Sequence, residues 1–347
     1  MRASRRLAVL GLAVLLLTAL PRLGGQLAER TEGRMENVRL LLEGTAPVST
    51  VARAPAQPSP TPVPALEEAD FRPLEEDEAL SHEPLITVME SVSPEEIRQT
   101  TIAGGLTIKN ETAYSVDVGR LLLDGPRLRL PAEGTQVLII HTHASEAYTQ
   151  AGLDRYEAND VSRTADTEFN IVRVGDELAR ILSEAGLQVI HDREIYDYPS
   201  YTGSYTRSGA AVERYLAEYP EIAVVIDMHR DALGANGVIY KTMAEEDGTV
   251  ASQVMLLVGT DESGLEHPNW ETNLSLALYL QDVVGRAHPT LMRPVALVSQ
   301  RYNQHLTGGA LILEVGSSGN TLQEALAAIR LFGEAAAPAL LALVEGS

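Results

Sequence analysis

The 347-residue sequence contains no cysteine, which limits the chemistry that it can carry. Disulfide scaffolds and thiolate zinc sites are excluded, so any bound metal has to be held by nitrogen and oxygen atoms. Positive charge is also scarce, because 27 Lys and Arg stand against 48 Asp and Glu. The formal net charge of -21 argues against a nucleic-acid partner, which would need clustered Lys and Arg.

One long apolar run stands at the N-terminus, from Leu7 to Leu20, directly after Arg5 and Arg6. Basic residues followed by an apolar segment are the layout of a secretory signal, and no clear small-x-small cleavage site follows before Arg22. We therefore predict a signal anchor over residues 1–24, with a cleaved signal peptide as the alternative. It would make the protein a single-pass protein of the cell membrane, with the rest of the chain outside the cytoplasm.

Residues 25–90 have a different composition from the remainder of the chain. A polar stretch predicted to be helical runs to about Glu43, and the segment from Thr45 to Pro84 is rich in Pro, Ala and Glu. Such a composition buries too little apolar surface to offset the cost of ordering the chain. We predict a disordered linker that holds the C-terminal domain away from the membrane.

From residue 91 to the C-terminus, short apolar strands alternate with amphipathic helices. The predicted strands cover Gly105–Lys109, Val116–Leu123, Val137–Ile140, Leu187–Ile190, Ala223–Ile226, Gln253–Val258, Pro294–Val298 and Ala310–Val315, and the predicted helices cover Asn170–Glu184, Ser208–Tyr219, Trp270–Ala287 and Thr321–Val344. A capping-box pattern at Thr321 and Glu324 opens the last helix. This alternation predicts an α/β domain over residues 91–347, with a mainly parallel or mixed sheet and helices on both faces.

Three of the predicted strands lead into polar residues, and the His, Asp and Glu side chains among them can bind a metal. These residues are His141, His143 and Glu146 after Val137–Ile140, then Asp227, His229, Arg230 and Asp231 after Ala223–Ile226, and Glu314 after Ala310–Leu313. In open α/β sheets, ligands bind beyond the carboxyl ends of the strands. We therefore expect two imidazoles and two carboxylates to converge at one edge of the sheet.

This set of residues is the set that a hydrolytic zinc site requires. Such a site has three His or carboxylate ligands and an open position for a water, whose pKa falls to about 7. His143, Glu146 and His229 are the candidate ligands. Glu314 is the candidate base, and its apolar neighbours are expected to raise its pKa. Ser145 is an unfavourable nucleophile, because it lacks the flanking glycines of a nucleophile elbow.

Several further residues are candidates for supporting roles. His141 and His143 are two positions apart, so a continuing strand would put both on one face, whereas a turn after Ile140 would leave His141 supporting the site rather than binding the metal. Arg230 and Asp231 either orient His229 or a substrate carboxylate, or form a plain ion pair. Tyr302 and Asn303 are candidate substrate-binding residues. Predicted loops also carry aromatic residues that often line glycan or peptide grooves, namely Tyr148, Tyr198, Tyr201, Tyr205 and Trp270.

An ordered series of motifs resembles the stage II sporulation protein P (SpoIIP) family over Val137 to Glu345. The motifs are HTHASEAY, NIVRVGDEL, DYPSYTGSYTRS, VVIDMHRDA, QVMLLVGT, HPNW, YNQHL and LILEVGSSGNT. Any one of them is a weak signal, but together and in order they are specific.

The resemblance implies a zinc-dependent peptidoglycan hydrolase, related in fold to the N-acetylmuramoyl-L-alanine amidases. Such an enzyme cuts the amide between N-acetylmuramic acid and L-alanine, and family members are also credited with cutting peptide cross-links. The family's zinc ligands match His143, Glu146 and His229, and its catalytic glutamate matches Glu314. The wider amidase family takes its glutamate ligand from the start of the following helix, where this chain offers Glu168, so both glutamates stay open.

The resemblance also implies a biological setting. The family acts during engulfment in sporulation, anchored in the membrane with its domain facing the cell wall, and it works with SpoIID-like and SpoIIM-like proteins. A catalytically silent wall-binding scaffold is the main rival, but all four key positions are filled here. A zinc carboxypeptidase or deacetylase on the same architecture is not excluded by the residues.

Overall fold

The computed structural model describes residues 82–88, 100–103, 106–148, 155–157, 163–235 and 238–346. The predicted signal anchor and the predicted polar helix lie outside these residues, as does the predicted linker up to residue 81. Within the described ranges, no helix combines the length and the apolar character that a membrane crossing requires.

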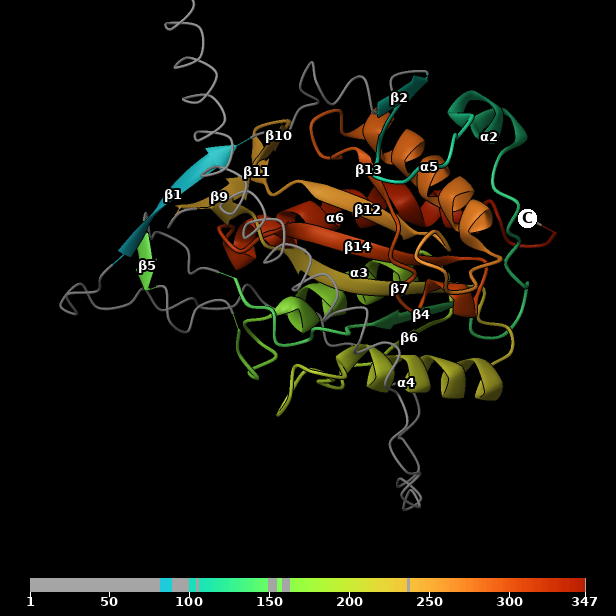
Figure 1. Cartoon of the computed structure of the whole chain (residues 1–347), viewed down its shortest axis with the longest axis horizontal. Helices are drawn as coiled ribbons and strands as arrows, with labels where there is room; N and C mark the ends of the chain where they lie inside the picture. Colours follow the sequence, from blue (N-terminus) through green and yellow to red (C-terminus); the bar gives the residue numbers. More distant parts are fainter. Residues whose placement is uncertain are drawn as a thin grey trace, which may run out of the picture. The chain divides into compact units, whose positions relative to one another are not determined.

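The centre of the domain is an eight-stranded sheet in the order β2-β3-β13-β12-β14-β7-β4-β6 (Figure 1). The strands are β2 (Thr100–Ala103), β3 (Leu106–Asn110), β4 (Val137–Ile140), β6 (Val189–His191), β7 (Val224–Asp231), β12 (Val254–Gly259), β13 (Val295–Val298) and β14 (Ala310–Ser317). Neighbouring strands in this sheet pair in parallel, except for β2 with β3 and β12 with β14. The predicted mainly parallel or mixed sheet is therefore confirmed, and β4, β7 and β14 end at the same edge.

Two small sheets lie outside the main one, and the sequence pattern did not predict them. The first has the order β5-β1-β9-β8, and the second is the hairpin β10-β11. Their strands are β1 (His82–Val88), β5 (Arg155–Glu157), β8 (Gly234–Ala235), β9 (Val238–Thr242), β10 (Ala244–Glu246) and β11 (Thr249–Ala251). These strands are short, so their periodicity is too weak to separate them from loops. β9 is tied to the end of β14, because Ser317 Oγ donates to the Tyr240 carbonyl at 2.6 Å.

Helices cover both faces of the main sheet, as predicted. α3 (Ile171–Glu184), α5 (Trp270–Ala287) and α6 (Leu322–Leu341) pack into the larger apolar core with Val137, Ile226 and Leu313. α4 (Ser204–Glu218) packs on the opposite face, where Val212 and Tyr215 contact a cluster with Leu138, Ile140 and Val225 (Figure 1). Along β4 the two cores alternate, because successive strand residues point to opposite faces.

The helix boundaries follow from capping residues in the sequence. The Asn170 side chain accepts a hydrogen bond from the Val172 N–H at the start of α3. At the start of α6, Thr321 and Glu324 form the predicted capping box. α5 has the predicted bounds, whereas α4 begins at Ser204, four residues before the predicted start.

One predicted strand is wrong, because Val116–Leu123 contains the helix α2 (Val118–Asp124). The Asp117 side chain caps this helix by accepting the Arg120 N–H, and Gly125 ends it with φ of 68°. Leu121, Leu122 and Leu123 are consecutive, so they do not show the alternation of a half-buried strand. A short polyleucine run was therefore misread as extended chain.

The contact between α3 and α6 makes a stability prediction. Leu178 is fully buried in the larger core, so replacing it with Ala should lower the free energy of unfolding by about 2–5 kcal/mol. Leu123→Ala is the matched control, because Leu123 is 90% exposed and its truncation should cost under about 0.5 kcal/mol. Urea denaturation of both variants measures the difference, and equal losses would contradict this packing.

Candidate metal centre

Asp227, His229 and Glu314 lie within β7 and β14 rather than after them. The sequence pattern predicts that these strands end at Ile226 and Val315, but β7 continues to Asp231 and β14 to Ser317. Glu314 is the register partner of His229, and Ile312 is the partner of Asp227. Partners on neighbouring parallel strands share a face of the sheet, so Asp227, His229 and Glu314 lie on the same face.

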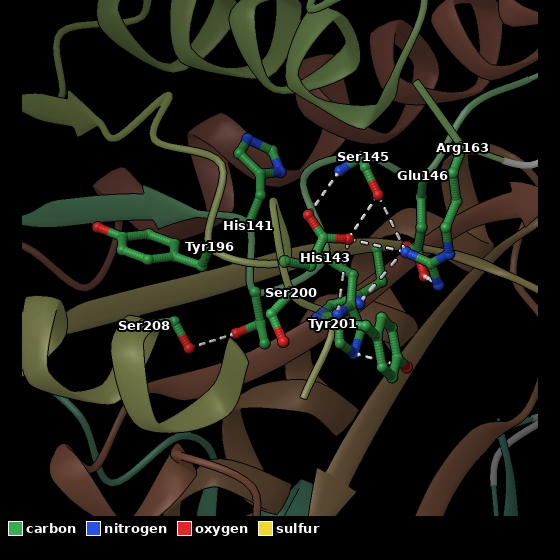
Figure 2. A network of polar contacts seen from close by, with 12 residues as sticks. His141, His143, Ser145, Glu146, Arg163, Tyr196, Ser200, Tyr201 and Ser208 are labelled. Atoms are coloured by element: carbon green, nitrogen blue, oxygen red, sulfur yellow. Dashed lines mark hydrogen bonds and ion pairs between the residues drawn. The ribbon is translucent and has the colours of Figure 1, made fainter. Parts of the chain in front are cut away.

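His141 and His143 diverge, which is the outcome expected if the backbone turns after Ile140. β4 ends at Ile140 and a turn follows, and Figure 2 shows His141 apart from His143 and Glu146. The fully buried His141 has Nδ1 3.2 Å from the Met228 carbonyl oxygen and Nε2 2.8 Å from His191 Nε2. His141 therefore contacts β6 and β7 instead of joining His143 and Glu146. This is the second of the two predicted alternatives.

A chain of polar contacts continues from His141 into α3. His191 Nδ1 lies 3.1 Å from Asp176 Oδ1, and Arg193 pairs with the same carboxylate. Gly175 makes room for this arrangement, because a Cβ at this position would lie 2.6 Å from His141 Nε2 and 2.7 Å from His191 Nε2. Any other residue at position 175 would therefore displace the histidine pair.

The structure brings His143, Glu146 and His229 together. The rings of His143 and His229 meet edge to face, with centroids 5.3 Å apart, and Glu146 Oε2 lies 3.6 Å from His229 Nδ1. The Arg230 N–H donates to the same Glu146 oxygen at 2.9 Å. Glu168, the alternative carboxylate, is exposed, and its N–H donates to Asp166 Oδ1. Glu146 is thus the glutamate that lies beside His229.

Charge pairing distinguishes the two histidines. Burial, together with a smaller effect of His229, lowers the pKa of His143 to about 4, so the His143 ring is neutral near pH 7. Burial also lowers the pKa of His229, but Asp227 and Glu146 outweigh this effect and raise its pKa above the ordinary value. Burial would raise the pKa of Glu146, yet His229 and Arg230 lower it to about 2. The two carboxylates around His229 therefore form a buried site that favours positive charge.

Glu314 has the opposite character. Burial is the main cause that raises the pKa of its carboxyl to about 8, while His229 lowers this pKa and Asp231 raises it by smaller amounts. Its Oε2 atom is buried and makes no hydrogen bond in the described part of the chain. A carboxyl group with a pKa near neutrality can accept and return a proton, which agrees with the expectation drawn from Leu311 to Leu313.

Four residues make contacts at this site that the sequence did not indicate, although Asp227 is also a possible metal ligand by sequence and Tyr201 a possible groove-lining residue. Asp227 Oδ1 lies 3.1 Å from His229 Nε2, and both Asp227 oxygens accept hydrogen bonds from Thr142. Arg163 contacts Glu146, and Tyr201 contacts His143 (Figure 2). Asp197 accepts hydrogen bonds from Ser145 and Arg163. Pairing between loops decides these contacts, and loops have no periodicity to indicate it.

The remaining predicted site residues have structural partners. Asp231 pairs with Arg293 at 2.8 Å. Of the two predicted alternatives, Asp231 therefore forms an ion pair and does not orient His229. Asn303 Nδ2 donates to the Tyr205 carbonyl at 2.8 Å and to Ser208 Oγ at 3.1 Å, so it ties its loop to α4. Tyr302 adopts a left-handed φ of 51° and its ring lies 5.4 Å from the Tyr205 ring. Tyr205 in turn stacks at 6.4 Å from the ring of His229.

The donor atoms fit a metal in chemistry but are not gathered around one point. Among the described residues, no three His, Asp or Glu side chains are placed so that they could hold a metal ion together. The donor set is nonetheless two imidazoles and a carboxylate, and His143 Nδ1 and His229 Nε2 are buried without a hydrogen bond. These are the nitrogen and oxygen ligands that zinc accepts.

An α/β sheet with this donor set beside a buried carboxyl group is an arrangement typical of hydrolytic metal enzymes. The sequence profile described as "Stage II sporulation protein P (SpoIIP)" matches residues 65–337, so the chain belongs to this family. The resemblance seen in the motifs is thereby confirmed.

The chain is also similar to individual proteins. It is 29% identical over 199 residues to stage II sporulation protein P of Bacillus subtilis (strain 168), a match that covers 54% of this chain and 47% of that protein. The chain thus spans about half the length of this curated relative.

Two solved structures are distantly similar. The N-acetylmuramoyl-L-alanine amidase AmiC2 of Nostoc punctiforme is 14% identical with a TM-score of 0.38, over 61% of this chain and 97% of that one. The CwlD amidase from Clostridioides difficile, solved in complex with the GerS lipoprotein, is 11% identical with a TM-score of 0.36, over 60% and 99% of the two chains.

The raised pKa of Glu314 makes a prediction for the metal-free protein. Burial raises this pKa from 4.5 to about 8, so between these values the native state keeps a proton that the unfolded chain has lost. The contribution of Glu314 to stability is therefore lost as the pH rises from about 5 to about 8. Glu314→Gln removes this loss, so its stability relative to wild type should increase with pH, by at most about 1.4 kcal/mol per pH unit.

Urea denaturation with a chelator present, repeated across this pH range, measures the trend. Glu177→Gln is the control, because burial raises the pKa of Glu177 but Arg180 and Arg330 lower it below its ordinary value. The Glu177 contribution is therefore constant above about pH 5, and its variant should show no trend. A flat difference for Glu314→Gln as well would mean that this carboxyl is not perturbed.

Proposed function

We propose that this protein is a zinc-dependent peptidoglycan hydrolase that cuts the amide between N-acetylmuramic acid and L-alanine during engulfment in sporulation. The observation that supports this proposal best is the placement of Glu314 in register with His229, beside His143 and Glu146. It supplies a basic carboxyl group next to a metal-binding donor set. Membership of the SpoIIP family supports peptidoglycan as the substrate.

His143, Glu146 and His229 would hold the zinc ion, which when bound lowers the pKa of a water and polarises the amide carbonyl. Asp227 keeps the His229 ring in place, and the Arg230 N–H keeps the Glu146 carboxylate in place. Glu314 takes a proton from the attacking water while the water oxygen forms a bond to the carbonyl carbon of the amide. Glu314 then returns this proton to the nitrogen of L-alanine as the C–N bond breaks.

The aromatic residues near the site are proposed to contact the glycan or the stem peptide. Tyr198 and Tyr201 are 65% and 55% exposed, and Tyr205 and Tyr302 lie together near His229. Rings at the edge of a site can pack against the apolar faces of sugars. This placement favours a polymeric substrate that extends across the sheet edge.

The cellular setting belongs to the same proposal. The apolar run from Leu7 to Leu20 would anchor the chain in the cell membrane, with the domain outside the cytoplasm and facing the cell wall. SpoIID-like and SpoIIM-like proteins are the proposed partners, through the family resemblance.

Anchoring is tested by fractionation of cells that express the full chain. The full chain should stay in the membrane pellet after a high-salt wash, because an apolar segment is not released by screening charges. A variant that lacks residues 1–24 should be soluble. Recovery of both forms in the soluble fraction would contradict a retained anchor.

The proposed roles predict that a variant of the base loses activity but keeps the metal, whereas variants of the ligands lose both. Glu314→Gln should lower the rate of peptidoglycan digestion by at least about 100-fold while the zinc content is kept, because the base is lost but the ligands remain. His143→Ala and His229→Ala should lose both zinc and activity. Mass spectrometry of fragments released from purified peptidoglycan and elemental analysis of the protein are the two measurements.

The fragments also discriminate between the candidate reactions. Free stem peptides with intact glycan are the products of the proposed amidase, whereas trimmed cross-links alone would indicate an endopeptidase. A zinc-loaded wild type that releases nothing, alone or with its proposed partners, would favour the silent scaffold. Near wild-type activity of Glu314→Gln would rule out Glu314 as the base.

A further inference from the structure

A second group of polar side chains lies where β12 and β13 end. β12 runs antiparallel to β14 and parallel to β13, so these two strands end at the edge of the sheet opposite to the one where β14 ends. The loop after β12 carries His267 in the HPNW motif. The loop after β13 carries Arg301, followed by the YNQHL motif with His305. None of these three residues has a part in the proposed zinc chemistry.

Hydrogen bonds hold the two loops together. Arg301 Nη1 donates to the Glu266 carbonyl at 3.0 Å, and Asn269 Nδ2 donates to the His305 carbonyl at 3.1 Å. The His267 and His305 rings meet edge to face, with centroids 6.5 Å apart. The two imidazoles and the guanidinium therefore form one cluster between the loops.

His267 is buried but has no polar partner. It is 1% exposed, and neither of its ring nitrogens makes a hydrogen bond in the part of the chain that the structure describes. An imidazole always carries at least one N–H, so this ring has a buried donor without an acceptor. Buried polar groups are nearly always paired in native proteins, and an unpaired one indicates a missing water, ion or ligand.

Two atoms beside His267 have the same need. His305 Nδ1 and Arg301 Nε are also buried, and neither makes a hydrogen bond among the described residues. Arg301 Nε can only donate, so its partner has to be an acceptor. Burial lowers the pKa of the Arg301 guanidinium, and the nearby Glu266 opposes this effect only in part. A lowered arginine pKa indicates that the charge lacks a compensating anion.

The charges of the cluster favour an anion over a cation. Burial lowers the pKa of His267 to about 4, and His305 and Arg301 lower it by smaller amounts. Asp261 has a small opposite effect, and its Oδ1 accepts the Tyr114 hydroxyl at 2.9 Å. Burial also lowers the pKa of His305 to about 4, so both rings are neutral near pH 7. Each neutral ring offers one N–H beside the permanent positive charge of Arg301, which would repel a metal ion.

The start of α5 adds to this preference. The helix begins at Trp270, three residues after His267, and the N-cap residue Asn269 makes no capping hydrogen bond with its side chain. Unpaired backbone N–H groups at the N-terminus of a helix favour negative charge nearby. The 18-residue helix thus contributes to the same electrostatic preference as Arg301.

We propose that His267, His305 and Arg301 bind one small oxyanion, a carboxylate or a phosphate group, between the loops that follow β12 and β13. The ligand would accept the hydrogens of Arg301 Nε and of the two rings. The inference goes beyond the proposed function and does not depend on zinc.

The site would also act on the metal centre, because the loop from Arg301 to His305 carries Tyr302. Tyr302 has a left-handed φ of 51°, and its ring lies 5.4 Å from the Tyr205 ring beside His229. A non-glycine residue keeps such a conformation where its surroundings hold it. A bound oxyanion would hold both ends of this loop and so keep Tyr302 in place.

The test is calorimetric titration of the full chain with inorganic phosphate and, separately, with sodium acetate at constant ionic strength. Arg301→Gln should weaken binding by about tenfold or more, because it removes a charge-assisted hydrogen bond. His267→Phe should weaken it by about two- to tenfold. Arg286→Gln is the matched control, because Arg286 lies in α5, pairs with Asp282 and should not affect binding.

The two probes distinguish the sources of the ligand. Tighter binding of phosphate would indicate a phosphate group, and tighter binding of acetate would indicate a carboxylate. Both titrations are made with zinc-loaded and with metal-free protein. Phosphate held by zinc would be lost when the metal is removed, whereas phosphate held by Arg301 would remain.

Three results would overturn the proposal. The first is that neither anion binds, and the second is that Arg301→Gln and Arg286→Gln bind equally well. The third is zinc that stays bound in His143→Ala and is lost when His267→Phe is added, because it would show that the cluster holds a cation.

A measurement without ligand covers an Arg301 variant that does not fold. In chloride buffer, His267→Phe should unfold at the same urea concentration as the wild type or at a higher one. Phenylalanine keeps an aromatic ring at this position and removes two unpaired nitrogens. A clearly lower midpoint would show that His267 is already satisfied, and the proposal would then fail.

Discussion

The pairing of His229 with Asp227 and Glu146 is the constraint on which the site depends. A charged imidazole without exposure to water is stable only if carboxylates compensate it, and each carboxylate must in turn be satisfied. Asp227 is satisfied by Thr142, which follows β4, and Glu146 by the backbone of Arg230 on β7. The need to compensate one buried ring therefore fixes the spacing between two strands and the turn that follows one of them.

The same pairing extends outward to the elements that surround the site. Thr142 Oγ1 lies 2.7 Å from Ser208 Oγ on α4, and Ser208 receives a hydrogen bond from Asn303. On the other side, Arg163 joins Glu146 to Asp197. These contacts carry little apolar surface, so they stabilise the domain weakly but orient its reactive side chains. Packing of α3 and α6 supplies the stability, and the polar contacts supply the geometry.

The sequence was sufficient where a periodic pattern or a capping residue exists. The helices α3, α5 and α6 and the strands β4, β12 and β13 were predictable, because each has regular apolar spacing or a defined start. The nearness of His143, Glu146 and His229 in space was also predictable, since each follows an apolar run. Three consecutive leucines in α2 show neither helical nor strand periodicity, so a strand was predicted where the structure has a helix.

The contacts that sequence reasoning missed are those made between loops. Asp197 and Tyr201 reach His143 from a segment more than fifty residues away in the chain, which no local pattern encodes. The direction of His141 depended on whether the backbone turned after Ile140, and only the three-dimensional structure decides that. Local physics therefore identifies the reactive residues, whereas tertiary contacts determine which of their atoms face one another.

The pairing of β1 has a mechanical consequence. Tension on the chain before His82 would load β1 first, and backbone hydrogen bonds would pass the load to β9 and β5. β9 follows His229 along the chain and is bonded to Ser317 just after Glu314, while β5 precedes Arg163. A pull from the N-terminal side would thus reach the main sheet through β9 and its bond to Ser317.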